Sequence, residues 1–331
     1  MDKLAKAFYE LQDIIQQYNS FLLIVHPHPD ADALGAAFSL RSYIHKQTGS
    51  KKKKTKTTEI YSLDLPMANL ASLFDFKKIT TKLNLEGKEV VIFLDRGDVY
   101  HLLKFPQKIA ASNKPPRKIV NIDHHLNTRL DNALNIRDTK ASSTSEIIYR
   151  FFQTVGFSPT PTEAQYLLSG IWFDTGGFKH SNTSAEVLKI AGELMRQGAS
   201  LNKIIRAASA DKPLNVLRLW GLALKRAQIN KQGIVYSYLT KKDLQEKGVK
   251  PEELNASYLS ELLNTIANTK FSIMLTENAD NTIKASLRSE EHKKTDVAKI
   301  ARRFLGGGHK LASGFEIKGK IKPTKDGFLI E

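Results

Sequence analysis

The first two hundred residues alternate short, uninterrupted apolar runs with segments whose apolar residues recur at helical spacing. The apolar runs have the length of β-strands and lie at 21–25, 59–62, 90–95 and 118–122. Helical patterns lie at 33–46, 101–112 and 145–155, and an amphipathic pattern precedes the first run at Leu4, Phe8, Leu11 and Ile15. Apolar runs without alternation, separated by helices, are typical of parallel strands buried on both faces. The pattern therefore predicts an α/β fold, with a parallel sheet covered by helices on both faces.

The pattern changes along the last third of the chain. A largely helical stretch covers 162–172, 185–197, 201–208 and 214–225. Beyond it, alternating segments at 234–239, 272–276, 282–288 and 312–317 indicate strands, with helical patterns at 251–268 and 296–304 between them. This change predicts a parallel-sheet domain over 1–208, a linker over 209–228 and a smaller α+β domain over 229–331.

Residue types that bind metals follow three of the predicted strands. They are His26, His28, Asp30 and Asp32 after the first run, Asp95 at the end of the third, and Asp123, His124 and His125 at the end of the fourth. Ligands of parallel sheets gather at the carboxyl ends of strands, so we expect these side chains to converge. Converging carboxylates repel one another unless a cation is bound among them. The sequence thus predicts a site for divalent metals and metal-dependent chemistry on phosphate groups.

The segment after the first strand is the strongest of these signals. Two prolines hold it out of helical backbone, and on an extended chain positions two apart share a side. His26, His28, Asp30 and Asp32 are therefore expected to point the same way. The alternative is that Asp30 or Asp32 caps the helix that follows, although two aspartates and a histidine at this spacing favour metal binding.

The other two strand ends leave more than one interpretation open. Asp95, taken alone, also suits a turn, but Asp98 is the better turn residue and a candidate cap for the next helix. Adjacent histidines point to opposite faces of an extended chain, so of His124 and His125 one is expected to bind metal and the other to face a substrate. A neighbouring carboxylate typically orients a ligating imidazole, which is the role we expect of Asp123.

Two further segments carry weaker signals. Asp174 follows an apolar helical pattern, and the sequence Thr-Gly-Gly after it allows the backbone to turn tightly. We therefore add Asp174 to the candidate ligands. The segment 143–146, Ser-Thr-Ser-Glu, matches a capping box that begins a helix.

The second predicted domain contains a glycine-rich string. It consists of Gly306, Gly307, Gly308 and His309. Successive glycines let backbone N–H groups converge into an anion-binding site, to which His309 and Lys310 add side-chain donors. The alternative, a glycine stop at the end of a helix, requires only one glycine. Arg288, at the end of a predicted strand, is a candidate for bidentate recognition of phosphate.

Composition narrows the possible partners. Fifty Lys and Arg against thirty-four Asp and Glu give a net charge of +16, which favours polyanions such as nucleotides or nucleic acid, although a lysine-rich proteome would produce the same excess. The lysine run at 51–54 is expected to be a solvated loop, with contact to an RNA tail as the alternative. The absence of cysteine excludes disulfides, zinc–thiolate sites and cysteine nucleophiles. Apolar runs too short to span a bilayer, and an N-terminus unlike a signal peptide, predict a cytoplasmic protein with no membrane partner.

These motifs, in this order, resemble those of the DHH phosphoesterase superfamily. That family is named for the Asp-His-His found here at 123–125, and its DHH-associated C-terminal domain is marked by the Gly-Gly-Gly-His found here at 306–309. The resemblance covers nearly the whole chain. The string at 174–183 is similar to the nanoRNase/pAp-phosphatase branch and to stand-alone cyclic-di-AMP phosphodiesterases.

The resemblance implies two divalent metal ions, usually manganese, with magnesium or cobalt as alternatives. The implied ligands are His26, Asp30 and Asp95 for one metal, and Asp32, Asp95, His124 and Asp174 for the other. Asp95 would then bridge the metals and be catalytic together with His125, which would face the scissile phosphate. The implied binding residues for another part of the nucleotide, across an interdomain cleft, are Arg288, Gly306, Gly307, Gly308 and His309.

The chain also departs from the family pattern at three positions. Ala36 stands where serine is frequent, Arg96 where a small residue is commoner, and Gly177 where a basic residue is frequent in this branch. None of these changes removes an implied ligand. The last two are expected to bear on substrate preference.

The resemblance implies a manganese-dependent phosphoesterase that hydrolyses short oligoribonucleotides to mononucleotides, pAp to AMP, or both, by a two-metal mechanism. Family resemblance favours a homodimer. One alternative is a cyclic-dinucleotide phosphodiesterase, and an alternative from another class is a non-catalytic nucleotide- or RNA-binding module. A processive exonuclease and an inorganic pyrophosphatase are disfavoured, because relatives with those activities differ in their C-terminal parts.

Overall fold

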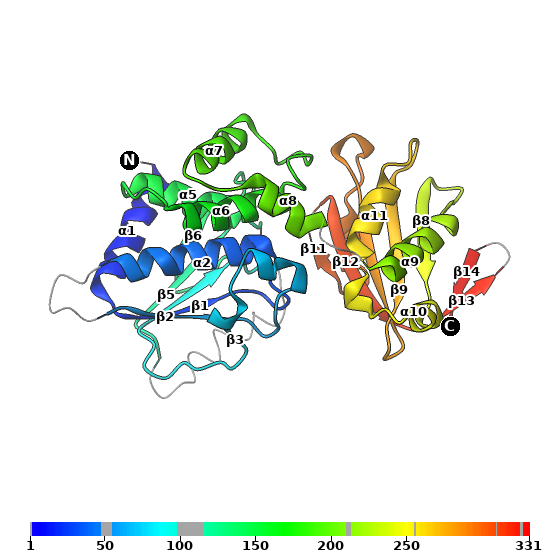
Figure 1. Cartoon of the computed structure of the whole chain (residues 1–331), viewed down its shortest axis with the longest axis horizontal. Coiled ribbons are helices and arrows are strands. Elements are labelled where there is room, and N and C mark those ends of the chain that lie inside the picture. Colours follow the sequence, from blue (N-terminus) through cyan, green and yellow to red (C-terminus); the bar gives the residue numbers. More distant parts are fainter. Residues whose placement is uncertain are drawn as a thin grey trace. The chain divides into compact units, whose positions relative to one another are not determined.

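The computed structural model describes residues 2–47, 55–97, 115–126, 128–209, 213–254, 256–308, 310–324 and 327–331 (Figure 1). The chain divides into two compact units, Met1–Ala210 and Asp211–Glu331, each built around its own sheet. Four sequence predictions lie outside the described residues, namely the helix at 101–112, the turn at Asp98, the lysine loop at 51–54 and the binding residue His309.

The first unit contains a six-stranded sheet in which every strand pair is parallel. Its strands are β1 (Ser20–Ile24), β2 (Thr57–Tyr61), β3 (Ile79–Thr80), β4 (Val90–Leu94), β5 (Lys118–Asp123) and β6 (Leu134–Arg137), in the order β3-β2-β1-β4-β5-β6. The predicted α/β fold is confirmed, and the four predicted strands are present with small shifts at their ends. The short strands β3 and β6 were not predicted.

Helices cover one face of this sheet, where α2, α5 and α6 lie together in Figure 1. The helices of the unit are α1 (Lys3–Gln17), α2 (Ala31–Lys46), α5 (Thr144–Thr154), α6 (Pro161–Asp174), α7 (Ala185–Arg196) and α8 (Leu201–Ser209). Along β1, Phe21 and Leu23 pack into the helical core, while Leu22 and Ile24 pack on the opposite face with loop residues that include Leu130. Burial of both faces explains why the strand sequence is apolar without alternation.

The strand order places a topological switch point between β1 and β4. From β1 the chain continues to β2 and β3 on one side, and from β4 to β5 and β6 on the other. The carboxyl ends of β1 and β4 are therefore neighbours, and the loops that leave them diverge. Ligands of open α/β sheets bind at this point.

The second unit contains a mixed sheet in the order β11-β12-β10-β9-β8-β7, antiparallel except for the pair β8–β9, and a hairpin of β13 and β14. Its strands are β7 (Gln228–Ile229), β8 (Ile234–Leu239), β9 (Phe271–Glu277), β10 (Thr282–Arg288), β11 (Gly307–Gly308), β12 (Ala312–Lys318), β13 (Ile321–Thr324) and β14 (Gly327–Ile330). Its helices are α9 (Leu214–Lys225), α10 (Lys241–Lys247), α11 (Ala256–Asn264) and α12 (Val297–Arg302). The α+β character expected of this part of the chain is thus observed.

Two boundaries differ from those predicted. The helix predicted at 214–225 is present as α9, but it is not part of a linker, because its Val216, Leu219 and Ala223 pack into a core of the second unit. The helical pattern at 251–268 is divided into a 3₁₀ turn at Pro251–Glu253 and α11, which ends at Asn264. Lys293 donates a hydrogen bond to the Asn264 carbonyl, so a side chain from another segment satisfies the end of this helix.

The helices that the structure describes are between 6 and 16 residues long. None of them combines the length and the apolar character that crossing a membrane requires.

Candidate metal centre

The segment that leaves β1 places two predicted ligands at the switch point. The His26 carbonyl accepts a hydrogen bond from Ser62 Oγ at 3.0 Å, which fixes the chain beside the end of β2. His26 Nε2 lies 3.8 Å from Asp30 Oδ1 and 3.9 Å from Asp95 Oδ2. Asp30 Oδ1 also accepts the backbone N–H groups of Asp32 and Ala33, at 2.9 and 3.0 Å. The capping alternative is therefore correct for Asp30, and it does not remove Asp30 from the cluster.

His28 does not join the cluster, contrary to the expectation that the four side chains share one side. Its backbone is left-handed, with φ of 50°, so the alternation of an extended chain is broken there. The His28 side chain is 80% exposed, and its Nε2 lies 3.6 Å from Asp64 Oδ2. The prolines on either side exclude helix but do not guarantee a straight strand.

Asp32 is held by the first turn of α5. The backbone N–H groups of Thr144 and Ser145 donate to its two carboxylate oxygens, at 2.6 and 2.8 Å. A helix N-terminus favours negative charge, so α5 stabilises the ionised form of this buried carboxylate. Thr144 Oγ1 also donates to Asp95 Oδ1 at 3.0 Å.

Thr144 and Ser145 are thus positioning residues that the sequence analysis missed. The capping prediction for 143–146 is confirmed in part: Ser143 Oγ accepts the Glu146 N–H at 3.0 Å, but the Glu146 carboxylate accepts the N–H of Ser142 and not that of Ser143. That interpretation accounted for Ser143 and left the next two residues without a role. A run of four small hydroxyl residues, Ser142 to Ser145, was the available signal.

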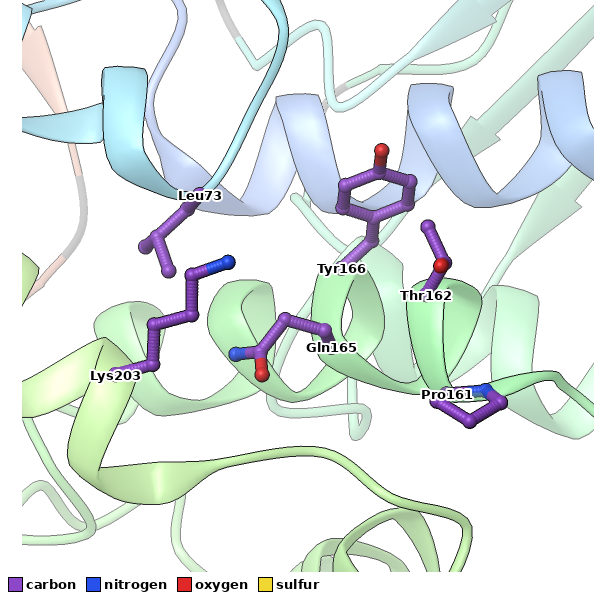
Figure 2. A pocket seen from close by; sticks show the side chains of 6 residues that line it. All are labelled: Leu73, Pro161, Thr162, Gln165, Tyr166 and Lys203. Carbon is purple, nitrogen blue, oxygen red and sulfur yellow. The ribbon is translucent and has the colours of Figure 1, made fainter.

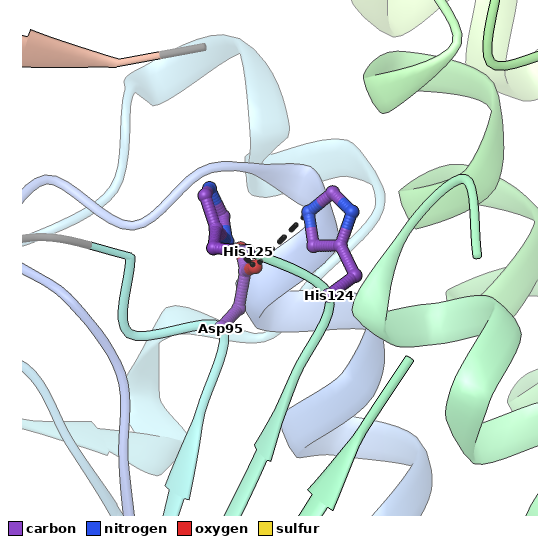
Figure 3. Close-up of side chains that lie close together, drawn as sticks. All are labelled: Asp95, His124 and His125. Atoms are coloured by element: carbon purple, nitrogen blue, oxygen red, sulfur yellow. Dashed lines mark ion pairs between the residues drawn. The ribbon is translucent and has the colours of Figure 1, made fainter. Parts of the chain in front are cut away.

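Asp95 lies at the centre of the cluster, as Figure 3 shows for its two histidine neighbours. It follows β4 directly, is 3% exposed, and has left-handed backbone with φ of 51°. Its Oδ1 lies 3.6 Å from His124 Nε2 and 3.5 Å from His125 Nδ1, whereas its Oδ2 faces His26. One oxygen of Asp95 is therefore directed to each side of the cluster.

Asp123 orients His125. Its Oδ1 accepts the His125 backbone N–H at 2.9 Å and lies 2.8 Å from His125 Nδ1. Its Oδ2 accepts the N–H groups of Arg96 and Gly97, at 2.9 and 3.2 Å, which joins the ends of β4 and β5. The two imidazoles do not point to opposite faces as expected, because β5 ends at Asp123 and both rings approach Asp95.

Asp174 completes the cluster from the last residue of α6. Its Oδ2 lies 3.5 Å from His124 Nε2. The tight loop that follows returns to it, since His180 Nδ1 and Asn182 Nδ2 lie 3.4 and 3.3 Å from the Asp174 carbonyl. Asn182 also donates to the Ser142 carbonyl at 3.1 Å, which ties this loop to the start of α5.

The potential ligand atoms form three overlapping groups, each with atoms within 4.8 Å of one another. The groups are His26, Asp30 and Asp95; Asp32, His124 and Asp174; and Asp95, His124 and His125. Asp95 and His124 each belong to two groups. Imidazole nitrogens and carboxylate oxygens are the donors that manganese, among other divalent metals, accepts.

The electrostatics of the cluster favour a bound cation. Burial, with repulsion from neighbouring carboxylates, raises the pKa of Asp32 and Asp95, and it raises the pKa of Asp174 to about 7. Burial opposes charge on His26 and His125, but nearby carboxylates outweigh it and raise the pKa of His26 to about 9 and that of His125 to about 10. A divalent cation would remove the carboxylate repulsion directly.

The hydroxyl of Thr144 gives a test of how this cluster is positioned. Thr144→Val keeps the shape of the side chain and the backbone bond to Asp32 but removes the hydrogen bond to Asp95. Loss of a group that orients a ligand typically costs 10- to 100-fold, so we expect manganese affinity to fall about 10-fold or more. Calorimetric titration measures this, with Thr144→Ser expected to retain wild-type affinity.

Thr154→Val is the matched control, because Thr154 lies at the other end of α5 and donates to the Arg150 carbonyl of the same helix. Equal manganese affinity in Thr144→Val and the wild-type protein would show that the hydroxyl does not position Asp95.

The predicted phosphate-binding residues of the second unit lie on neighbouring strands. Arg288 ends β10 and pairs in register with Ala312 of β12, whereas Gly307 and Gly308 pair with β12 from its other side. Burial lowers the pKa of the Arg288 guanidinium, which contacts Ser257 Oγ and donates to the Leu287 carbonyl at 3.0 Å. His309 lies outside the described residues.

The glycines do not serve as the helix stop. Leu305, with φ of 58°, is the left-handed residue after α12, and Gly306 N–H bonds to the Ala301 carbonyl at 3.0 Å across that turn. Glycine is required instead for close contact with β12. A Cβ atom on Gly306 would lie 2.2 Å from the Gly314 carbonyl oxygen, and one on Gly308 would lie 2.6 Å from that of Ala312.

A separate cavity of about 230 Å³ lies at the other end of α6 (Figure 2). Its lining consists of Leu73, Pro161, Thr162, Gln165, Tyr166 and Lys203, and none of these is a predicted site residue. Asp174 is the last residue of this 14-residue helix, and Tyr166, the lining residue nearest to it in sequence, is separated from it by about 12 Å of helix. The lining of this cavity contains no member of the three ligand groups.

Fold and cluster together define a class, that of hydrolases that act on phosphate esters. Family models agree: "DHH family, N-terminal domain" matches residues 20–171, and "DHHA1 domain" matches residues 231–326. The chain belongs to the DHH superfamily of phosphoesterases, with a DHHA1 domain as its second unit. The sequence resemblance is thereby confirmed.

Individual relatives span most of the chain. The bifunctional oligoribonuclease and PAP phosphatase NrnA of Bacillus subtilis is 29% identical over 312 residues, which cover 93% of this chain and 92% of that protein. A probable manganese-dependent inorganic pyrophosphatase of Streptococcus agalactiae is 28% identical over 234 residues, or 64% of this chain and 71% of that protein. The structure of an exopolyphosphatase-related protein from Bacteroides fragilis has the same fold, with a TM-score of 0.84 and 24% identity over 97% of this chain and 94% of that one.

Proposed function

We propose that the chain hydrolyses short oligoribonucleotides to mononucleotides and adenosine 3′,5′-bisphosphate (pAp) to AMP, with two divalent metal ions in the cluster. The full-length similarity to a bifunctional oligoribonuclease and PAP phosphatase supports the substrate class. The observation that carries the metal assignment is the position of Asp95, whose two carboxylate oxygens are directed to two different ligand groups.

In this proposal His26, Asp30 and Asp95 hold one metal. The other metal would be held by the group of Asp32, His124 and Asp174, together with Asp95, whose Oδ1 lies 3.6 Å from His124 Nε2. When bound, the two cations supply a water of lowered pKa and counter-charge for the phosphoryl oxygens. Manganese fits a donor set of carboxylates and imidazoles without thiolate, and a manganese-dependent relative supports that choice.

The remaining site residues position the substrate and each other. Because Asp123 fixes both the backbone and the ring of His125, we assign His125 to the scissile phosphate as a donor of fixed orientation. Attack by water on the phosphorus breaks the bond to the leaving oxygen, which takes up a proton, and a mononucleotide or inorganic phosphate is released. Arg288 and the Gly306–Gly308 strand, with His309, are assigned to a phosphate elsewhere on the nucleotide.

A substrate panel tests this function. The purified chain is incubated with manganese and, separately, diadenylate RNA, pAp and cyclic-di-AMP, and products are separated by chromatography. We expect diadenylate and pAp both to yield AMP. Asp32→Ala, which removes a buried ligand carboxylate, is expected to abolish turnover of both.

Each other outcome has a distinct meaning. Cleavage of cyclic-di-AMP alone would replace the proposal with a cyclic-dinucleotide phosphodiesterase. Tight binding of intact diadenylate without turnover, with manganese bound, would indicate a non-catalytic nucleotide-binding module. Full activity of Asp32→Ala would contradict the two-metal assignment.

A further inference from the structure

An aromatic pair on the second unit has one ring largely open to solvent. The rings of Phe304 and Phe315 are stacked, with centroids 4.4 Å apart and planes 19° from parallel. Phe315 packs against the core of the unit from β12, and Phe304 lies over it. Phe304 is nevertheless 45% exposed, and the following Leu305 is fully exposed. Phe304 is thus stacked on Phe315 through one face of its ring and still has much of its surface accessible to a planar ligand.

This pair adjoins the glycine strand directly. Gly306 faces Phe315 so closely that a Cβ atom on Gly306 would lie 2.5 Å from the Phe315 Cβ. The strand β11 that follows is at the edge of the six-stranded sheet. Gly307 is exposed, and no other atom lies within 4 Å of the position that its Cβ would occupy. Backbone groups on the outer side of an edge strand are available to a ligand, and Gly307 and Gly308 carry no side chains of their own to cover them.

Positive charge surrounds the same surface. Arg302, Arg303 and Lys310 flank the pair and the glycine strand in sequence, and all three are exposed. Arg302 folds back to donate to the Ala298 carbonyl at 3.3 Å, and Lys310 lies 3.0 Å from Glu291. A flat aromatic face can stack on the base of a nucleotide. Exposed backbone N–H groups and nearby cations can bind its phosphate.

We propose that Phe304 is the stacking surface for a nucleobase of the substrate, with the phosphate of that nucleotide at the β11 glycine strand. This rests on the proposed function, because it assumes a nucleotide substrate, but it adds a site for the base. It explains why the aromatic ring extends beyond the core next to backbone that only glycine permits. The site requires no metal, so base binding and hydrolysis are separable.

Binding in the presence of EDTA tests the base site without the metal cluster. Equilibrium dialysis of the full chain is carried out with AMP and with ribose 5-phosphate, which lacks the base. Base–aromatic stacking is worth about 1–3 kcal/mol, so Phe304→Leu is expected to weaken AMP binding about 5- to 150-fold. Phe304→Trp keeps an aromatic face and is expected to bind AMP as tightly as the wild-type protein, or more tightly. Binding of ribose 5-phosphate is expected to be the same in all three.

Tyr258→Leu is the matched control. Tyr258 is 46% exposed and stacks on Trp220 in the same unit, with centroids 5.0 Å apart and planes 20° from parallel, but it lies on α11. This variant is expected to leave AMP binding unchanged. Equal weakening of AMP binding by Tyr258→Leu and Phe304→Leu would overturn the proposal, as would equal wild-type affinity for AMP and ribose 5-phosphate.

Turnover separates this inference from the proposed function. If the wild-type protein hydrolyses diadenylate and Phe304→Leu leaves its KM unchanged, the base site is wrong and the function stands. If AMP binds in EDTA through Phe304 but no substrate is hydrolysed with manganese, the base site stands and the proposed function is wrong. A rise of KM at least 5-fold in Phe304→Leu, with kcat nearly unchanged, is the expected result.

Discussion

Asp95→Asn is expected to lower kcat for diadenylate on the order of 10³-fold or more, and to reduce the manganese bound per chain. The reason is the geometry of this one carboxylate. Its Oδ1 faces His124 and its Oδ2 faces His26, so its two oxygens are directed to both sides of the cluster. An amide offers one oxygen and no negative charge, and thus cannot join two cations. Steady-state kinetics and elemental analysis of the dialysed protein measure the two effects.

Asp131→Asn is the control for this substitution. Asp131 is exposed in the loop between β5 and β6 and belongs to none of the ligand groups. The control variant is expected to keep full activity and full metal content. Unchanged circular dichroism of Asp95→Asn would show that it folds, since asparagine still accepts a hydrogen bond from Thr144 Oγ1. A fully active Asp95→Asn with two metals bound would rule out a bridging role.

In the first unit, the strands that are buried on both faces of the sheet could be predicted from the sequence. The strand β4 is buried at all five residues, which leaves an apolar run that no helix period explains. The strand β6 has only one buried residue of four, and β3 is two residues long, so neither carries enough pattern to be recognised. Their positions follow from pairing with β5 and β2 in the folded sheet. The local sequence of β3 or β6 does not indicate which strand it will pair with.

The ligand residues were predictable for a different reason. Aspartate and histidine directly after an apolar strand are chemically conspicuous, and the parallel topology brings strand ends together without further information. The contacts that hold those ligands were not predictable. Thr144 reaches Asp95 across 49 positions of sequence, and its amide reaches Asp32 across 112. Those contacts depend on where α5 packs, which a capping motif alone does not specify.

Two residues adopt backbone conformations that their sequence context does not imply. His28 adopts a left-handed conformation that prolines at 27 and 29 do not imply, so the expected side of the chain was wrong. Leu305 takes the left-handed position after α12 that glycine usually occupies, which frees the glycines for β11. Neither conformation follows from the local preference of the residue, because non-glycine residues rarely adopt left-handed backbone.

Removal of metal is expected to abolish hydrolysis and to lower the thermal stability of the first unit. Without a cation, the carboxylates of Asp32, Asp95 and the partly buried Asp174 repel one another, and their pKa values are raised. Manganese at 100 times its Kd would add about 2.7 kcal/mol, or roughly 5–10 °C in Tm for a unit of this size. Scanning calorimetry of EDTA-dialysed protein, before and after manganese, measures the shift.

The pH dependence of this shift has a definite sign. The pKa of Asp174 is raised from 3.8 to about 7 in the folded chain, so its contribution to stability is fully present below about pH 4 and is lost as pH rises through 7. Asp174 should therefore make the metal-free protein less stable at pH 8 than at pH 6. The gain in Tm on adding manganese should accordingly be larger at pH 8. Asp174→Asn removes the titrating group, so in EDTA this variant should have a higher Tm than the wild-type protein at pH 8, yet its Tm should rise less when manganese is added.

An EDTA-dialysed wild-type protein that elemental analysis shows to be metal-free, but that still hydrolyses diadenylate, would contradict the metal assignment altogether.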